Sequence, residues 1–220
     1  MLQRSLLTIA ILALATLPGR AQTGEWKQLF NGKDLTGWQQ VGPGRFVIED
    51  GTLKPEGGMG LLWYTGGKIG NAVVRVVFKT TQDNDNAGVF IRIPIKPREE
   101  WMPVHYGYEV QIYNAGDDHH CTGVLYSLTT ALARAAKPLG EWNTMEITLD
   151  GPHTVVVLNG VKVTDYTEGQ PVPPRAKDYE PQRGRRPNAG YIGLQNHPRE
   201  DNTDSAVYFK EVAVRPLKKK

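Results

Sequence analysis

A carboxylate and an amide alternate with apolar residues in one short stretch of the sequence, residues 107–114. Because successive side chains of a strand point to opposite faces, Glu109 and Gln111 share one face and leave the other face apolar. A glutamate in the middle of a strand is unfavourable unless its charge is paired or its face borders water. The face of Glu109 is therefore either the solvated exterior of a sheet or the floor of a binding groove, where Glu109 can act as a general acid or base.

His197 is the second side chain whose type suits proton transfer, since an imidazole titrates near neutral pH. It follows a strand-like run, residues 190–195, and a histidine at the end of a strand can be catalytic or structural. Arg92 ends the apolar run of residues 87–91. Its planar guanidinium can pair with Glu109 or hydrogen-bond a polar ligand.

Aromatic residues near the ends of expected strands point to carbohydrate as the ligand class. Sugars combine apolar C–H faces, which stack on aromatic rings, with hydroxyls, which need amide or charged partners. Each ring taken singly can also belong to the core, and Trp38 and Trp142 are assigned to structure. The residues assigned to substrate binding are Arg92, Gln111, Gln195, Trp63, Trp101 and Tyr108.

Two stretches contain the side-chain types that bind metal ions. Residues 83–86 (DNDN) have the oxygen-rich composition of a calcium loop but lack the rest of the EF-hand pattern, which favours a plain turn. Residues 117–121 (DDHHC) are denser in ligand types, but neighbouring residues of an extended chain cannot all turn toward one ion. The metal ligands are therefore left unassigned. The sequence contains no phosphate-binding glycine loop, GxSxG elbow, CxxC pair or HExxH motif.

Residues 1–21 have the composition of a secretory signal peptide. Arg4 precedes an apolar run, residues 6–17, and small residues flank a cleavage site near residue 21. The run is too short to cross a hydrocarbon core of roughly 30 Å as a helix, although an uncleaved anchor is the alternative interpretation. We therefore expect a periplasmic or secreted mature chain, residues 22–220, that forms one domain with no membrane span after cleavage.

Composition and charge exclude several classes of protein. The chain has 220 residues, of which 40% are hydrophobic and 22% charged, so it is not a disordered, collagen-like or multi-span membrane protein. The formal net charge is +3, but lysines 218–220 and the two arginines of the leader supply more positive charge than that excess. The body is close to neutral, which argues against nucleic acid as a partner.

Short alternating runs and turn signals, without a sustained helical stripe, predict an all-β fold. The pairs Asp50-Gly51 and Asn159-Gly160 are typical of tight hairpin turns. Ten or more strands without crossover helices favour two antiparallel sheets packed as a sandwich. The expected strands are residues 45–49, 52–54, 73–79, 87–93, 108–113, 144–150, 154–158, 161–166, 190–195 and 206–216.

Three further segments do not follow the strand pattern. Alanine and leucine cluster in residues 129–136, where a short helix is expected. Residues 94–107 and 169–187 are rich in proline, and loops of such length are usually functional or disordered. The first of them carries more aromatic residues, which favours an ordered loop.

The sequence resembles the 3-keto-disaccharide hydrolase domain family. Residues 29–38 (LFNGKDLTGW) match its opening signature. Further motifs follow in the order of the family, at residues 51–54, 87–92, 107–112, 141–143, 158–160, 190–197 and 209–217. The resemblance implies a two-sheet antiparallel jelly-roll sandwich of the concanavalin A-like lectin/glucanase type, and carbohydrate chemistry outside the cytoplasm. The chain departs from the family pattern at residues 169–187 and 119–121.

The resemblance also implies a reaction that needs only one carboxylate. Retaining glucanases on such a fold need two carboxyls about 5–5.5 Å apart, and the face of Glu109 offers one. A ketone at C3 of a sugar acidifies the C2 hydrogen, so a base can remove it, the C1 substituent can leave, and water can add afterwards. Glu109 and His197 would be base and acid in either order, while Arg92, Gln111 and Gln195 hold the keto sugar or its oxyanion.

Cofactor and partners follow from the same reaction. A divalent ion (Ca²⁺, Mg²⁺ or Mn²⁺) can replace Arg92 as the electrophile, and a sugar 3-dehydrogenase acting upstream would supply the keto substrate. The competing interpretation is a non-catalytic carbohydrate-binding module on the same fold, because fold does not specify function. A purely structural or protein-interaction domain is the third.

Overall fold

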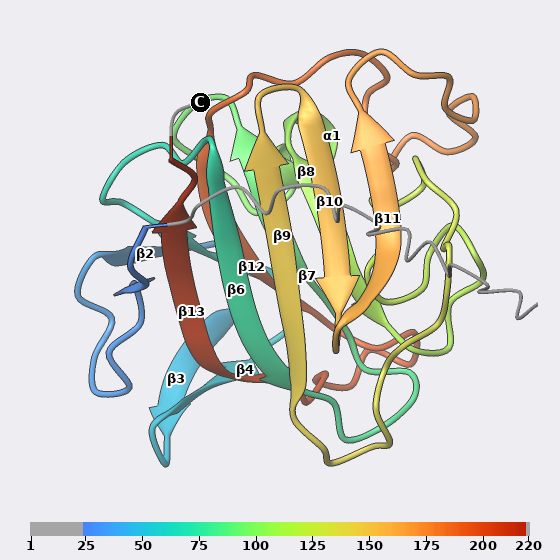
Figure 1. Ribbon diagram of the computed structural model, residues 1–220. Helices are drawn as coiled ribbons and strands as arrows, with labels where there is room; N and C mark the ends of the chain where they lie inside the picture. The colour runs from blue at the N-terminus through green and yellow to red at the C-terminus, as the bar shows by residue number, and fades with distance from the viewer. Residues whose placement is uncertain (1–23, 219–220) are drawn as a thin grey trace, which may run out of the picture.

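Two antiparallel β-sheets and one short helix make up the fold of residues 24–218, the part of the chain that the computed structural model describes (Figure 1). The larger sheet has the order β11-β10-β9-β6-β13-β4-β3, with β1 paired to β13. Its strands are β1 (Lys27–Gln28), β3 (Arg45–Glu49), β4 (Thr52–Glu56), β6 (Ala72–Lys79), β9 (Asn143–Asp150), β10 (His153–Leu158), β11 (Val161–Thr167) and β13 (Tyr208–Pro216).

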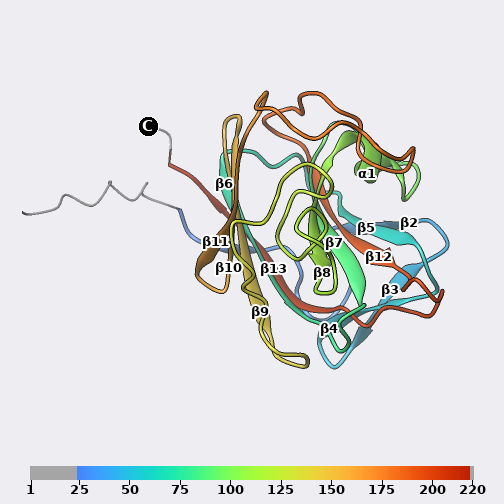
Figure 2. The same ribbon diagram turned by 90° about the vertical axis from the view of Figure 1, so that its right-hand side faces the viewer.

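The smaller sheet carries the residues that could do chemistry. Its order is β2-β5-β12-β7-β8. The strands are β2 (Trp38–Val41), β5 (Gly60–Tyr64), β7 (Asn86–Ile93), β8 (Tyr108–Tyr113) and β12 (Tyr191–His197). The helix α1 (Met102–Tyr106) lies on the side of this sheet that faces away from the larger sheet (Figure 2). The predicted antiparallel sandwich is therefore confirmed.

Tight turns join neighbouring strands as the sequence predicts. Asp50 and Gly51, between β3 and β4, have φ angles of 49° and 74°. Asn159 and Gly160, between β10 and β11, have φ angles of 51° and 85°. Positive φ at both central residues is the geometry whose twist matches that of paired strands, and glycine and asparagine adopt it at low cost.

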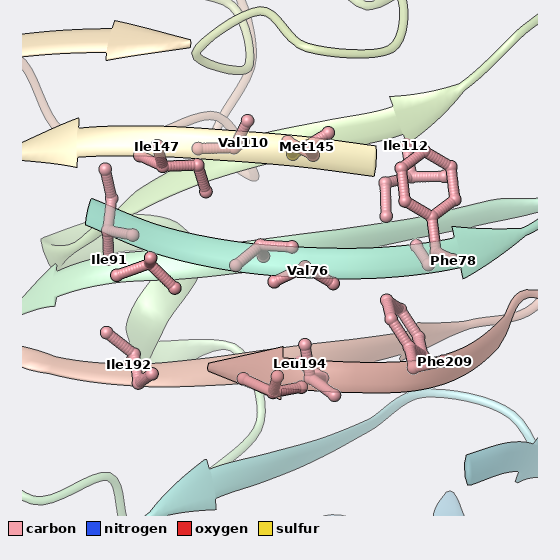
Figure 3. Close-up of a cluster of buried hydrophobic side chains, with 14 of the residues drawn as sticks. Val76, Phe78, Ile91, Val110, Ile112, Met145, Ile147, Ile192, Leu194 and Phe209 are labelled. Atoms are coloured by element: carbon pink, nitrogen blue, oxygen red, sulfur yellow. The ribbon is translucent and has the colours of Figure 1, made fainter. Parts of the chain in front are cut away.

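The core lies between the two sheets. Val110 and Ile112 of β8 are fully buried and point toward the larger sheet (Figure 3). The larger sheet contributes side chains such as Val76, Phe78 and Phe209 to the same cluster. The predicted alternation along β8 is thus confirmed. Because the apolar side chains of β8 fill the core, Glu109 and Gln111 must point out of the sandwich on the opposite face of the smaller sheet.

The prediction of a short helix at residues 129–136 is wrong, because that segment forms neither helix nor strand. Its backbone groups are bound by tertiary partners instead: the Leu132 N–H donates to the Val163 carbonyl, and the Asn159 amide donates to the Ala135 carbonyl. The helix occurs instead in residues 94–107, where a proline at the first helical turn is compatible with helical geometry.

The described residues contain no candidate for a membrane-spanning helix, because no helix within residues 24–218 is long and apolar enough to span a membrane. The predicted signal peptide, residues 1–21, lies outside the described residues, so it stays a prediction.

Candidate active site

Three neighbouring strands, β12, β7 and β8, bring the polar side chains of the smaller sheet together. Gly88 of β7 pairs with Gln195 of β12 on one side and with Gln111 of β8 on the other. Two pairs further along, and so on the same face of the sheet, Asn86 lies opposite His197. A cavity of about 360 Å³ opens over this floor. Its lining residues are Asn86, Trp101, Val104, Glu109, Gln111, Tyr126, Tyr179, Gln195, His197 and Glu200.

Gly88 leaves room for the Glu109 side chain at the centre of the floor. A Cβ at Gly88 would lie 2.5 Å from Glu109 Oε1 and 2.6 Å from its Cγ. The carboxyl therefore lies across the β7 backbone, and the side chain of Gln195 on β12 is its hydrogen-bond partner. Glycine is required here because any side chain would displace the carboxyl.

Burial controls the charge of Glu109. The residue is only 4% exposed, and this burial raises the pKa of its carboxyl to about 8, against the opposing effect of the Gln195 hydrogen bond. Within residues 24–218, no lysine or arginine lines the cavity to stabilise a carboxylate. At neutral pH the side chain therefore holds its proton and can donate it.

His197 has the opposite shift. Its Nδ1 lies 2.6 Å from the Pro198 carbonyl oxygen. A carbonyl only accepts, so Nδ1 carries the proton and Nε2 keeps a lone pair. Burial lowers the pKa of the imidazole, which therefore stays neutral at pH 7. A neutral imidazole with a free lone pair is a general base.

The amide of Asn86 is oriented by its neighbours on the floor. Gln111 Nε2 donates to Asn86 Oδ1 over 2.9 Å, so Asn86 Nδ2 is on the side of His197, 3.3 Å from Nδ1. Because that Nδ1 already carries a proton, the Asn86 N–H groups stay available to a ligand. The side-chain oxygens of Gln111 and Gln195 are buried without a hydrogen-bond partner, so they are acceptors suited to hydroxyl groups.

The cavity has aromatic and acidic walls that the sequence analysis placed only in part. Trp101, predicted to bind substrate, lines the cavity, and its ring meets that of His197 edge-on with centroids 6.3 Å apart. Tyr126 and Tyr179 come from loops, and no sequence pattern marks them. Glu200 adds an exposed carboxylate that accepts a hydrogen bond from Tyr113.

The prediction that Arg92 binds substrate is wrong. Arg92 is fully buried, and its guanidinium donates to Thr154 Oγ1, the Gly151 carbonyl and the Pro187 carbonyl. The cause is local: the β7–β12 register shifts beside it, and Arg92 has a φ of 54°. The side chain is thereby directed toward β10 of the larger sheet and away from the cavity.

Tyr108 and Trp63 do not line the cavity either, which corrects both predictions. Tyr108 belongs to the core face of β8, and its hydroxyl donates to Glu168 over 2.9 Å. Trp63 lies on the same face as Glu109 but is buried against Met102 and Val104 at α1. Its burial beneath the helix leaves it no surface for a ligand.

The two metal-like stretches have other roles. In residues 83–86 the buried Asp85 accepts hydrogen bonds from Arg199 and from backbone N–H groups, so this stretch is a braced turn. In residues 117–121, His120 Nδ1 pairs with Asp117 over 2.7 Å. Within residues 24–218 no three His, Cys, Asp or Glu side chains are arranged to hold a metal ion. The cavity therefore does not fit a metal held by such a set, and no step proposed below depends on one.

Residues 25–215 match a family model described as the 3-keto-alpha-glucoside-1,2-lyase-like domain. The chain belongs to this family. The match spans nearly all described residues and confirms the resemblance derived from the sequence motifs. Membership makes the chain a carbohydrate-active protein and supports an enzyme.

Solved structures show the same fold. A protein of Parabacteroides distasonis, provisionally described as a glycosyl hydrolase, is 26% identical with a TM-score of 0.69, over 88% of this chain and 100% of its own. A Bacillus subtilis protein of unknown function with a galectin-like fold has a TM-score of 0.60 at 11% identity, over 87% and 94%. The Bacillus subtilis carbohydrate-binding module CBM66 has a TM-score of 0.52 at 12% identity, over 80% and 93%. No curated protein matches the sequence.

Proposed function

We propose that this protein cleaves 3-keto glycosides by removing the C2 proton and expelling the C1 substituent, followed by addition of water. The observation that supports this most strongly is a pair of titratable groups in one cavity, Glu109 and His197, whose pKa values are shifted in opposite directions. Opposite shifts of neighbouring groups mark a matched acid and base. The order left open by the sequence then becomes His197 as base and Glu109 as acid.

In the first half of the reaction, the Nε2 lone pair of His197 takes the proton from C2. The electrons of the broken C–H bond form an enolate with the C3 ketone, and the C1–O bond then breaks. Glu109 gives its proton to the departing oxygen, so the products are an unsaturated keto sugar and an alcohol. Each transfer suits a group in the protonation state that burial already favours.

In the second half, the two groups exchange roles. Glu109, now a carboxylate, accepts a proton from water as its oxygen adds to C1. The imidazolium of His197 returns its proton to C2, which restores the saturated keto sugar. The net reaction is hydrolysis, and both side chains regain their starting states.

The enolate oxygen needs a hydrogen-bond donor that is already in place. Asn86 Nδ2 suits this role because Gln111 fixes the amide and the protonated Nδ1 of His197 cannot accept from it. The buried oxygens of Gln111 and Gln195 would accept from ring hydroxyls. A polar floor with aromatic walls is the usual composition of a sugar site.

The test uses a 3-keto glucoside in deuterated water. Loss of the substrate and incorporation of deuterium at C2 are followed by NMR for the wild type, Glu109→Gln and His197→Asn. We expect both variants to lose at least about 100-fold in kcat, and exchange at C2 to require His197. Matched controls are Glu141→Gln and His153→Asn, which change an exposed and a half-buried residue outside the cavity. Hydrolysis without deuterium at C2 would reject the elimination.

Glu200 supports a conventional hydrolysis as the second candidate, because it gives the cavity a second carboxyl group beside that of Glu109. In that mechanism Glu109 is the acid, Glu200 the nucleophile or base, and the sugar needs no ketone. The Glu200→Gln variant distinguishes the two: elimination tolerates this change, whereas conventional hydrolysis does not. Binding of sugars without turnover of oxidised or unoxidised glycosides would instead favour a carbohydrate-binding module.

The location and the partner enzyme belong to the same proposal. The predicted signal peptide at residues 1–21 supports a periplasmic or secreted protein. A 3-keto glycoside must be formed by oxidation of a C3 hydroxyl, so an oxidoreductase acting on the same glycoside has to precede this protein. Fractionation of cells that express the full chain tests the location.

A further inference from the structure

We infer that Tyr179, presented by the proline- and arginine-rich residues 169–187, forms with Tyr126 a subsite for a ring-bearing leaving group. The inference rests on the proposed function and adds which residues of this chain contact the leaving group, when that group is a ring such as a second sugar or an aryl group. Both tyrosines line the cavity. Residues 169–187 contain no strand or helix, so other contacts must hold Tyr179 in place.

Arg183 supplies the first of these contacts. Its guanidinium donates to the carbonyls of Pro173 and Pro181, each over 2.8 Å, and so links two limbs of the segment. It also donates to the Ser127 carbonyl, beside Tyr126 in the chain. A planar guanidinium that binds several carbonyls at once fixes their relative positions.

Glu180, the residue after Tyr179, is the second anchor. Its side chain is buried, and its carboxylate accepts from the Ala176 N–H over 3.0 Å and from Arg183 over 3.1 Å. These bonds involve Glu180 and not the Tyr179 side chain, which is 55% exposed. A large exposed ring next to a buried anchor is positioned by the backbone while its face stays available to a ligand.

The segment is also bound to the region of α1. The Gln182 N–H and Arg186 Nη2 both donate to the His105 carbonyl over 3.1 Å, and Arg186 Nε donates to the Gly107 carbonyl over 2.9 Å. In Figure 2 the orange segment runs across the top of the sandwich to α1. The walls that carry Tyr179 and Trp101 are therefore joined by hydrogen bonds.

The position of the acid indicates which part of a substrate Tyr179 meets. The Tyr126 N–H donates to the Glu109 carbonyl over 2.9 Å, and the cavity is lined by Glu109, Tyr126 and Tyr179 together. Tyr126 is thus held beside the acid and shares the cavity with Tyr179. Because Glu109 protonates the departing oxygen in the proposed reaction, the leaving group extends along these two rings. His197 and Trp101 contact the other ring, which bears the C3 ketone.

The experiment compares two 3-keto glucosides, one with a methyl and one with a phenyl leaving group, on Tyr179→Ala, Tyr179→Phe and the control Tyr106→Ala. Tyr106 is 51% exposed and lies outside the cavity lining. Tyr179→Ala should lower kcat/KM for the phenyl substrate roughly three- to tenfold, as expected for one lost ring contact. The methyl substrate, Tyr179→Phe and Tyr106→Ala should change less than about twofold. Equal losses on both substrates, or no loss, overturn the inference.

Two further measurements test whether Arg183 holds Tyr179 in place and whether the subsite exists independently of the proposed reaction. Arg183→Gln should reproduce the loss that is selective for the phenyl substrate, whereas the exposed Arg185→Gln should not. If the wild type cleaves neither substrate, the elimination proposal fails, and binding of methyl and phenyl glucosides is then measured by calorimetry. A preference for the phenyl ligand that Tyr179→Ala removes supports the subsite, and equal binding refutes it. A glucosyl leaving group in the same series distinguishes a sugar ring from an aryl ring.

Discussion

Replacement of Glu109 by glutamine should remove a loss of stability that the wild type suffers as the pH rises. This tests directly whether the buried Glu109 side chain is protonated in the folded protein. The folded state holds this proton more tightly than the unfolded state, because burial raises the pKa from 4.5 to about 8. The contribution of Glu109 to the free energy of unfolding therefore falls as pH rises from about 4.5 to about 8, and is level outside that window. At about 1.4 kcal/mol for each pKa unit, the total loss is roughly 5 kcal/mol.

The assay is urea unfolding of the wild type and of Glu109→Gln at intervals from pH 4 to pH 9. All other titrating groups are common to the two proteins, so the difference between their unfolding free energies isolates Glu109. That difference should shift toward the variant by roughly 5 kcal/mol across the range, and the same comparison with the exposed Glu141→Gln is the control for loss of a carboxyl group. A flat line for Glu109→Gln, or a slope of the opposite sign, would show an ionised Glu109 and remove the proposed acid.

Three further predictions concern the site and the fold that supports it. Gly88→Ala places a methyl group 2.5 Å from the Glu109 carboxyl, so kcat should fall about 100-fold, whereas Gly24→Ala, which meets only ordinary contacts, should leave kcat unchanged. The pH profile of kcat/KM should lose activity below the lowered pKa of His197, which lies under 6.5, and above about 8, where Glu109 ionises. Arg92→Met should leave three main-chain carbonyls without their donor and lower the free energy of unfolding by about 3 kcal/mol or more, measured by urea unfolding.

The strands that could be predicted are those with one apolar face. Along β8, alternation alone placed Val110 in the core and Glu109 outside it. Strand β5 escaped prediction because Gly60–Tyr64 (GLLWY) is buried on both faces, one of them under α1, and a strand of that kind shows no alternation.

The predicted site residues divide along the same physical line. Glu109 and Gln111 were accessible from strand period, and the same period on residues 86–93 would have indicated Asn86 beside Gly88. Arg92 was misplaced because a local register shift changes which face a side chain meets, and composition does not encode that shift. Tyr126 and Tyr179 reach the cavity through tertiary contacts of loops, which one sequence cannot reveal.

Asp85 has a consequence for any attempt to re-engineer the loop of residues 198–206. Its carboxylate binds Arg199 and the Ala206 N–H, and it directly precedes Asn86 in the chain. The loop is thus bound to the end of the sheet where the His197 imidazole contacts the Asn86 amide. A transplanted loop of another length would break these hydrogen bonds. The distance between His197, the proposed proton acceptor, and Asn86, the proposed oxyanion donor, would then change although neither residue had been replaced.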